Sequence, residues 1–64
     1  VISIGSKVRI IRDPYFGKLG SVISLPSELM KIDTETNVRV AEIEFDDSTR
    51  EIIPRANLEV ILSD

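Results

Sequence analysis

The sequence contains no cysteine and no histidine. Without cysteine there are no disulfide bonds and no thiolate ligands, and without histidine the side chain that most often acts as a general base is missing too. The usual zinc sites are excluded, because their ligands come mainly from these two residue types. This composition is compatible with an intracellular protein, and we expect a cytoplasmic one.

Long apolar runs are also absent. No run reaches the roughly 18 to 20 residues of a membrane span, and the N-terminus lacks the basic start and apolar middle of a signal peptide. We therefore expect a soluble domain with no membrane partner. Because the chain starts at Val1 rather than at Met, we expect it to be part of a longer protein. Its 64 residues can bury one small core, so residues 1–64 are predicted to form a single domain.

Groups that carry catalysis are scarce. The seven Ser residues have no His to activate them, and a Lys base would need a burial that the pattern does not indicate. Asp46 and Asp47 are adjacent, so their side chains point in different directions and do not share one site. A hard-cation site that added Asp33 and Glu44 to them would lack the spaced Asp-x-Asp-x-Asp-Gly pattern, and a solvated acidic turn is the better interpretation. We predict no enzyme activity, no metal and no cofactor.

The net charge of −3 is unevenly distributed along the chain. Residues 1–25 carry four basic side chains and one acidic one, a net +3, whereas residues 26–64 carry four basic and ten acidic ones, a net −6. Proteins that bind nucleic acids mainly by electrostatics display a large basic face, because neutralised phosphates supply most of that affinity. The acidic excess argues against such a binder but leaves room for a local basic patch near the N-terminus.

Apolar and polar residues alternate from Ile2 to Ile10, the period-two pattern of a strand that buries one face. Asp13-Pro14 and then Gly17 predict a tight turn, because Pro fixes its own φ and Gly tolerates positive φ. Leu19–Leu25 is predicted to be the second strand. Gly20 is expected where a side chain would obstruct a neighbouring backbone.

Residues 26–36 interrupt the strand pattern and predict an extended loop between the second and third strands. Ser27 is a candidate cap for one or two helical turns. Leu29, Met30 and Ile32 either fold back over one end of the sheet, which we favour, or form an exposed apolar docking patch.

The second half predicts three more strands, over residues 38–45, 49–53 and 58–62. Apolar positions change face near Ala41, which predicts a bulge or a bend there. Residues 46–48 form a polar turn, and residues 55–57 are predicted to form a single 3₁₀ turn after Pro54. The predicted core consists of Ile4, Val8, Ile10, Leu19, Val22, Val38, Val40, Ile43, Phe45, Ile52 and Leu58.

Five short strands joined mostly by hairpin-like connections predict an all-β fold, a small five-stranded antiparallel SH3-like barrel. Residues 5–22 add a signature to this pattern: Gly5 and an alternating strand, a Gly/Pro-rich turn, and then Gly20-Ser21-Val22. This segment resembles the KOW motif of ribosomal and transcription-elongation proteins. The chain as a whole is similar to the C-terminal domain of NusG, apart from residues 26–36.

The resemblance implies three possible functions. NusG-like domains join RNA polymerase complexes to a ribosomal protein or a termination factor, which implies a protein partner in the transcription or translation machinery. KOW-bearing ribosomal proteins contact RNA, which implies ribosomal RNA binding through Arg12, Lys18 and Tyr15 as an alternative. A third possibility is an architectural domain that packs against other parts of its parent protein.

The candidate binding residues lie at the predicted turn and are Arg12, Pro14, Tyr15, Phe16 and Lys18. We predict that Tyr15 anchors a partner and that Phe16 is partly structural, because neighbours at a turn tip seldom both face solvent. Four arginines are expected to form ion pairs at the rim: Arg9, Arg39, Arg50 and Arg55. The isolated domain is expected to be a monomer.

Overall fold

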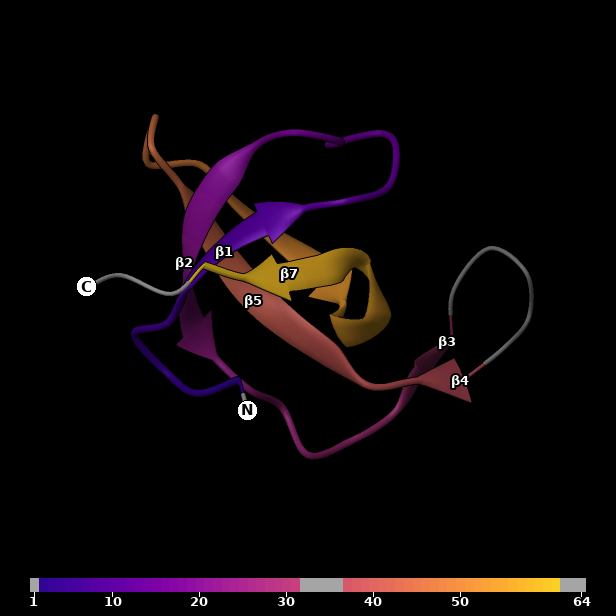
Figure 1. Cartoon of the computed structure of the whole chain (residues 1–64). Helices are drawn as coiled ribbons and strands as arrows, with labels where there is room; N and C mark the ends of the chain where they lie inside the picture. The colour runs from indigo at the N-terminus through magenta and orange to yellow at the C-terminus, as the bar shows by residue number, and fades with distance from the viewer. Residues whose placement is uncertain (1, 32–36, 62–64) are drawn as a thin grey trace.

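A computed structural model describes residues 2–31 and 37–61 of the chain. The fold is all-β, and five antiparallel strands form one sheet in the order β6-β5-β2-β1-β7 (Figure 1). These strands are β1 (Lys7–Ile10), β2 (Leu19–Ser24), β5 (Val40–Phe45), β6 (Arg50–Pro54) and β7 (Leu58–Val60). Two short strands, β3 (Met30–Lys31) and β4 (Asn37–Val38), form a separate two-stranded sheet. The five predicted strands are confirmed, as is the 3₁₀ turn over Arg55–Asn57.

The five-stranded sheet does not close into a barrel, so the closed ring that the sequence predicted is not formed. Strands β6 and β7 are its two edges, and each has one strand neighbour. Strand β6 ends at Pro54, which has no N–H to donate, and the 3₁₀ turn follows at once. Strand β7 is only three residues long and pairs with β1.

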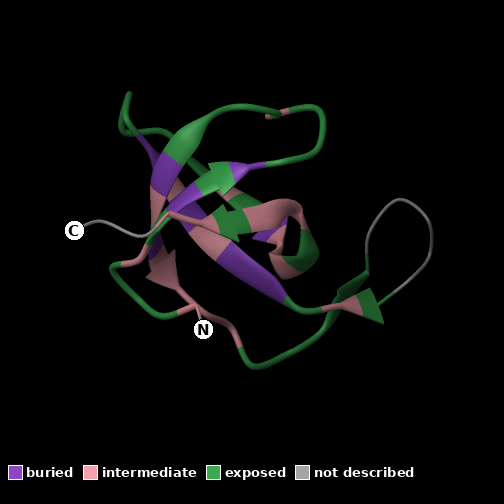
Figure 2. Ribbon diagram, viewed as in Figure 1, coloured by how far each residue is buried: buried purple, intermediate pink, exposed green. Residues whose placement is uncertain are grey.

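The sheet wraps around one core, to which all five strands contribute. Buried side chains come from β1, β2, β5 and β6, and the half-buried Leu58 and Val60 of β7 pack against them. Figure 2 shows that the buried positions lie on these strands, where they alternate with more exposed ones, and that most of the loops are exposed. Six of the predicted core residues are buried: Val8, Ile10, Val22, Val40, Ile43 and Phe45.

Three predicted core residues are instead exposed: Ile4 by 68%, Leu19 by 47% and Ile52 by 44%. Opposite residues in an antiparallel pair share a face, and Ile53, not Ile52, lies opposite the buried Ala41. Leu19 lies opposite the exposed Arg9 for the same reason. At Ile4 the alternation fails because the chain turns at Ile4 and Gly5, and Gly5 has a φ of +93°. The predicted core members Val38 and Leu58 are half-buried.

The prediction for Gly20 is confirmed. Gly20 lies opposite Phe45 in the β2–β5 pair. A Cβ atom there would lie 2.7 Å from the Glu44 carbonyl oxygen and 2.7 Å from the Ile43 Cγ2 atom, closer than van der Waals contact allows. Near Ala41, where a bulge or a bend was predicted, the consecutive residues Val40 and Ala41 are both buried, but the β5–β6 register is unbroken there. The irregularity in the pairing of β5 lies on β2, between Val22 and Ser24.

The segment after β2 differs from its prediction. Residues 27–31 form no helical turn, and Met30 and Lys31 pair instead with Val38 and Asn37. Figure 1 shows this hairpin to one side of the five-stranded sheet. Leu29 is 53% exposed, so its predicted packing over the end of the sheet is wrong, and Met30 is exposed as well. Ile32 lies outside the described residues.

Two of the four predicted arginine ion pairs are found among residues 2–31 and 37–61. Arg9 pairs with Glu59 across β1 and β7, and Arg50 pairs with Glu44 across β6 and β5, each at 3.5 Å. Arg39 and Arg55 bind main-chain carbonyls instead. Arg39 donates to Ser27, and Arg55 donates to Val40 at 2.8 Å and to Pro26 at 3.0 Å. The Arg39 bond joins the segments on either side of the β3–β4 hairpin. The two Arg55 bonds join both of these segments to the 3₁₀ turn.

Candidate functional site

The loop between β1 and β2 is held at its base by main-chain hydrogen bonds. The Ile10 N–H donates to the Lys18 carbonyl at 2.9 Å, and the Gly17 N–H donates to the Ile10 carbonyl at 2.8 Å. Within the loop, the Lys18 N–H donates to the Tyr15 carbonyl at 2.9 Å, which closes a four-residue turn. Gly17 is the third residue of this turn and has φ of +87°, as a type II turn requires. Phe16 is therefore fixed at the tip.

Phe16 projects into solvent, with 68% of its surface exposed. It lines a hollow of about 520 Å³ together with Ile11, Arg12 and Asp13. Ile11 is 39% exposed, and its N–H donates to the Asn57 carbonyl in the 3₁₀ turn at 2.8 Å. The loop thus presents the apolar side chains of Phe16 and Ile11, with the charged side chains of Arg12 and Asp13 at the same hollow.

Tyr15 turns the other way and packs against the core. Its ring centroid lies 5.4 Å from that of Phe45, with the two planes tilted by 41°. The pKa of Tyr15 is raised, first by desolvation and then by the charge of Glu51 and a hydrogen bond to it. The burial of the two aromatics is therefore the reverse of what was predicted: Tyr15 is half-buried against the core, and Phe16 is exposed.

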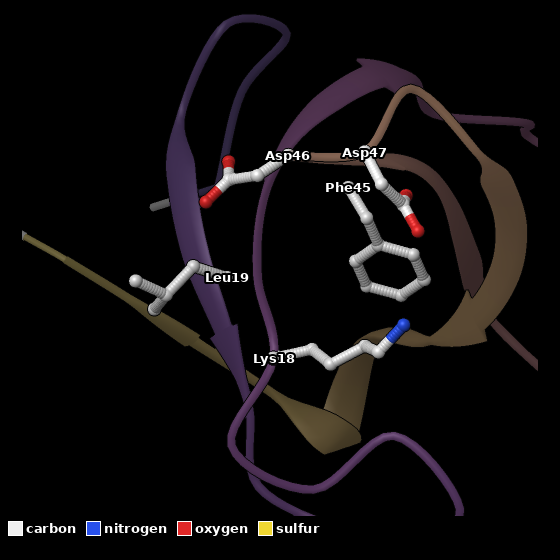
Figure 3. Close-up of a pocket in the computed structure, with 5 residues that line it drawn as sticks. All are labelled: Lys18, Leu19, Phe45, Asp46 and Asp47. Atoms are coloured by element: carbon white, nitrogen blue, oxygen red, sulfur yellow. The ribbon is translucent and has the colours of Figure 1, made fainter.

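Lys18 lies over both rings of this pair. Its Nζ atom is 4.9 Å from the Phe45 centroid and 5.9 Å from the Tyr15 centroid, within the range of cation–π contacts. The side chain borders a second hollow, of about 240 Å³, which Leu19, Phe45, Asp46 and Asp47 also line. Figure 3 shows Leu19 and Asp46 on one side of this hollow, with Phe45 and Asp47 on the other.

The turn between β5 and β6 supplies the two carboxylates. The Asp47 Oδ1 atom accepts hydrogen bonds from the Thr49 hydroxyl at 2.6 Å and from the Thr49 N–H at 3.1 Å. These bonds, and the charge of Lys18 to a smaller extent, lower the pKa of Asp47. Ser48 completes the turn with φ of +71°, a value that glycine adopts more readily.

Four of the five predicted site residues therefore divide between two places. Arg12 and Phe16 line the first hollow, Lys18 lines the second with Tyr15 packed behind it, and the exposed Pro14 lines neither. The sequence analysis missed Ile11, although two consecutive isoleucines at the end of an alternating strand place one of them outside. It also missed the contribution of Phe45, which depends on a contact between distant segments.

Charged and polar side chains lie at or near the surface in the part of the chain that the structure describes. Among residues 2–31 and 37–61, no charged or polar side chain is buried and no three acidic side chains gather in a way that could hold a metal ion. In that same part of the chain, no helix is long and apolar enough to cross a membrane.

Comparisons with protein-family models, with curated proteins and with solved structures find no match to this chain. The likeness to KOW domains therefore stays a prediction, whose motif lies in residues 5–22. In the structure these residues form β1, the loop that carries Phe16 and most of β2.

Proposed function

We propose that this chain is a non-catalytic interaction module that docks a protein partner through Phe16 and Ile11. The observation that carries the proposal is the 68% exposure of Phe16 at the tip of a loop that is hydrogen-bonded at its base. Exposed aromatics on a fixed backbone are favourable anchors, because little conformational entropy is lost when they bind. Ile11 and the hollow beside Phe16 provide an apolar surround for a partner side chain.

We propose the SH3-like barrels as the finer fold class, although the sheet is open between β6 and β7. All five strands share one core, and the edge strands β6 and β7 are joined by a single 3₁₀ turn. The likeness of residues 5–22 to the KOW motif favours a partner in the transcription or translation machinery.

The distribution of charge favours a protein partner over RNA. Arg9 is paired with Glu59, and Lys18 lies over two rings beside Asp46 and Asp47. Two of the four positive charges of residues 1–25 therefore lie beside carboxylates from later segments, which repel phosphates. RNA binding through Arg12, Lys18 and Tyr15 is the second candidate, and packing within a parent protein is the third.

Photo-crosslinking from position 16 tests the proposal. A benzophenone amino acid replaces Phe16 in one variant and Ile52 in a control, since Ile52 is also exposed and apolar but lies on β6. We expect a discrete protein adduct from position 16 and none from position 52. Equal adducts from both positions would contradict docking through this loop. RNA adducts would favour the second candidate, and adducts confined to the parent protein the third.

A further inference from the structure

The hollow beside Phe45 combines aromatic surface with negative charge. We name it the Phe45 pocket and define it by the residues that line it: Lys18, Leu19, Phe45, Asp46 and Asp47. Tyr15 packs behind the Phe45 ring at 5.4 Å. Ring faces carry negative electrostatic potential, so two rings in contact attract a cation placed over them.

A cation already occupies this position. The ammonium group of Lys18 lies 4.9 Å from the Phe45 centroid and 5.9 Å from the Tyr15 centroid. Figure 3 shows its side chain reaching beneath the Phe45 ring, with the Asp47 carboxylate above the same ring. The chain's own lysine therefore displays the kind of group that these rings accept.

The charge around the Phe45 pocket exceeds what one lysine neutralises. Asp46 and Asp47 both line it, and the Glu51 carboxylate nearby accepts a hydrogen bond from Tyr15, which packs on Phe45. Two carboxylates thus line a pocket that holds one ammonium group. A cation from another molecule would be attracted to this site, whereas an anion would be repelled.

We propose that the Phe45 pocket binds the ammonium group of a lysine side chain from a partner protein, and that Lys18 fills the pocket in the free domain. The exposed Leu19 gives the aliphatic stem of the incoming lysine an apolar surface to lie on. The pocket is separate from the hollow at Phe16, so it can act whether or not Phe16 docks a partner.

Displacement of Lys18 is feasible because the residue is exposed. Cation–π contacts at exposed sites shift an equilibrium by about two- to fivefold. The affinity for an incoming lysine is reduced by the fraction of molecules in which Lys18 fills the pocket. Removal of the Lys18 amine should therefore tighten binding by a similar factor.

The test uses a blocked Gly-Lys-Gly peptide and a matched peptide with norleucine, which keeps the stem but lacks the amine. Each is titrated into the domain while the ring resonances of Tyr15 and Phe45 are followed by NMR. The variants are Lys18→Ser and the control Lys7→Ser, which removes the same charge from an exposed residue that contacts neither ring. A thermal melt of each variant verifies that it is folded.

We expect the lysine peptide to shift these resonances in the wild-type domain, and Lys18→Ser to bind it about two- to fivefold more tightly. Lys7→Ser should bind like the wild type, and Asp46→Asn should bind more weakly. The proposal is overturned if the norleucine peptide causes the same shifts. It is also overturned if folded Lys18→Ser binds the lysine peptide no better than Lys7→Ser does.

Discussion

The Tyr15 ring packs on the Phe45 ring with centroids 5.4 Å apart and planes tilted by 41°. This contact joins the β1–β2 loop to the end of β5, two segments that are 30 residues apart in the chain. Because Tyr15 faces inward, its neighbour Phe16 is left at the tip of the turn, facing solvent. One residue thus fixes the loop while the next is presented by it.

Truncation of Tyr15 should destabilise the domain. Tyr15→Ala loses the ring contact and part of a buried apolar surface, and we expect a loss of about 2 kcal/mol in the free energy of unfolding. Tyr15→Phe keeps the ring and removes only the hydroxyl that bonds Glu51, so it should lose less than half of that. Urea unfolding followed by circular dichroism measures both. Equal losses for the two variants would show that the ring contact is unimportant.

A side chain at Gly20 should be poorly tolerated. Even Gly20→Ala places an atom 2.7 Å from the Glu44 carbonyl oxygen, and main-chain atoms in a paired strand cannot move away freely. We expect a loss of about 1 to 3 kcal/mol, and more for Gly20→Val. Ser21→Ala, one residue along β2, is the control and should change stability by less than about 0.5 kcal/mol. A melt of Gly20→Ala that matches the wild type would contradict the β2–β5 pairing.

Glycine at position 48 should stabilise the β5–β6 turn. Ser48 has φ of +71°, which disfavours residues that carry a Cβ atom. Ser48→Gly is expected to raise the free energy of unfolding by about 0.5 to 1 kcal/mol. The same change at Ser27, which is exposed and has no positive φ, should give no gain. A lower melting temperature for Ser48→Gly would argue against this turn geometry.

The acid sensitivity of the domain should depend on Thr49. Hydrogen bonds from Thr49 lower the pKa of Asp47 below its ordinary value of 3.8. A carboxyl group with a lowered pKa stabilises the fold above its unfolded-state pKa, and this stabilisation is lost as the pH falls through the folded-state value. Thr49→Val removes the hydroxyl bond, so the Asp47 pKa should rise and the loss of stability below pH 3.8 should become less steep. An NMR titration of the Asp47 carboxyl group measures the shift directly, and an unchanged pKa in Thr49→Val would contradict the assignment.

The positions of the strands could be predicted from the sequence because they depend on local patterns. Period-two alternation located β1 and β2, and the need for a residue without a side chain at Gly20 followed from its place early in a strand. The 3₁₀ turn followed from Pro54, which ends a strand by removing a donor.

Features that depend on pairing between distant segments could not be predicted. Ile52 and Ile53 are both apolar, and only the register that sets Ile53 opposite Ala41 decides which of them is buried. The same limit applies to Tyr15 and Phe16, because a turn can direct either of two adjacent aromatics inward. The contact with Phe45 decides between them.

Phe16→Ala, measured for stability and for binding together, tests the proposed docking site most directly. Since Phe16 is 68% exposed, its truncation should change the free energy of unfolding by less than about 0.5 kcal/mol. Affinity for the protein that crosslinks from position 16 should nevertheless fall by about tenfold or more, as truncation of an aromatic anchor commonly causes. Unchanged affinity of a folded Phe16→Ala variant for that protein would contradict the account.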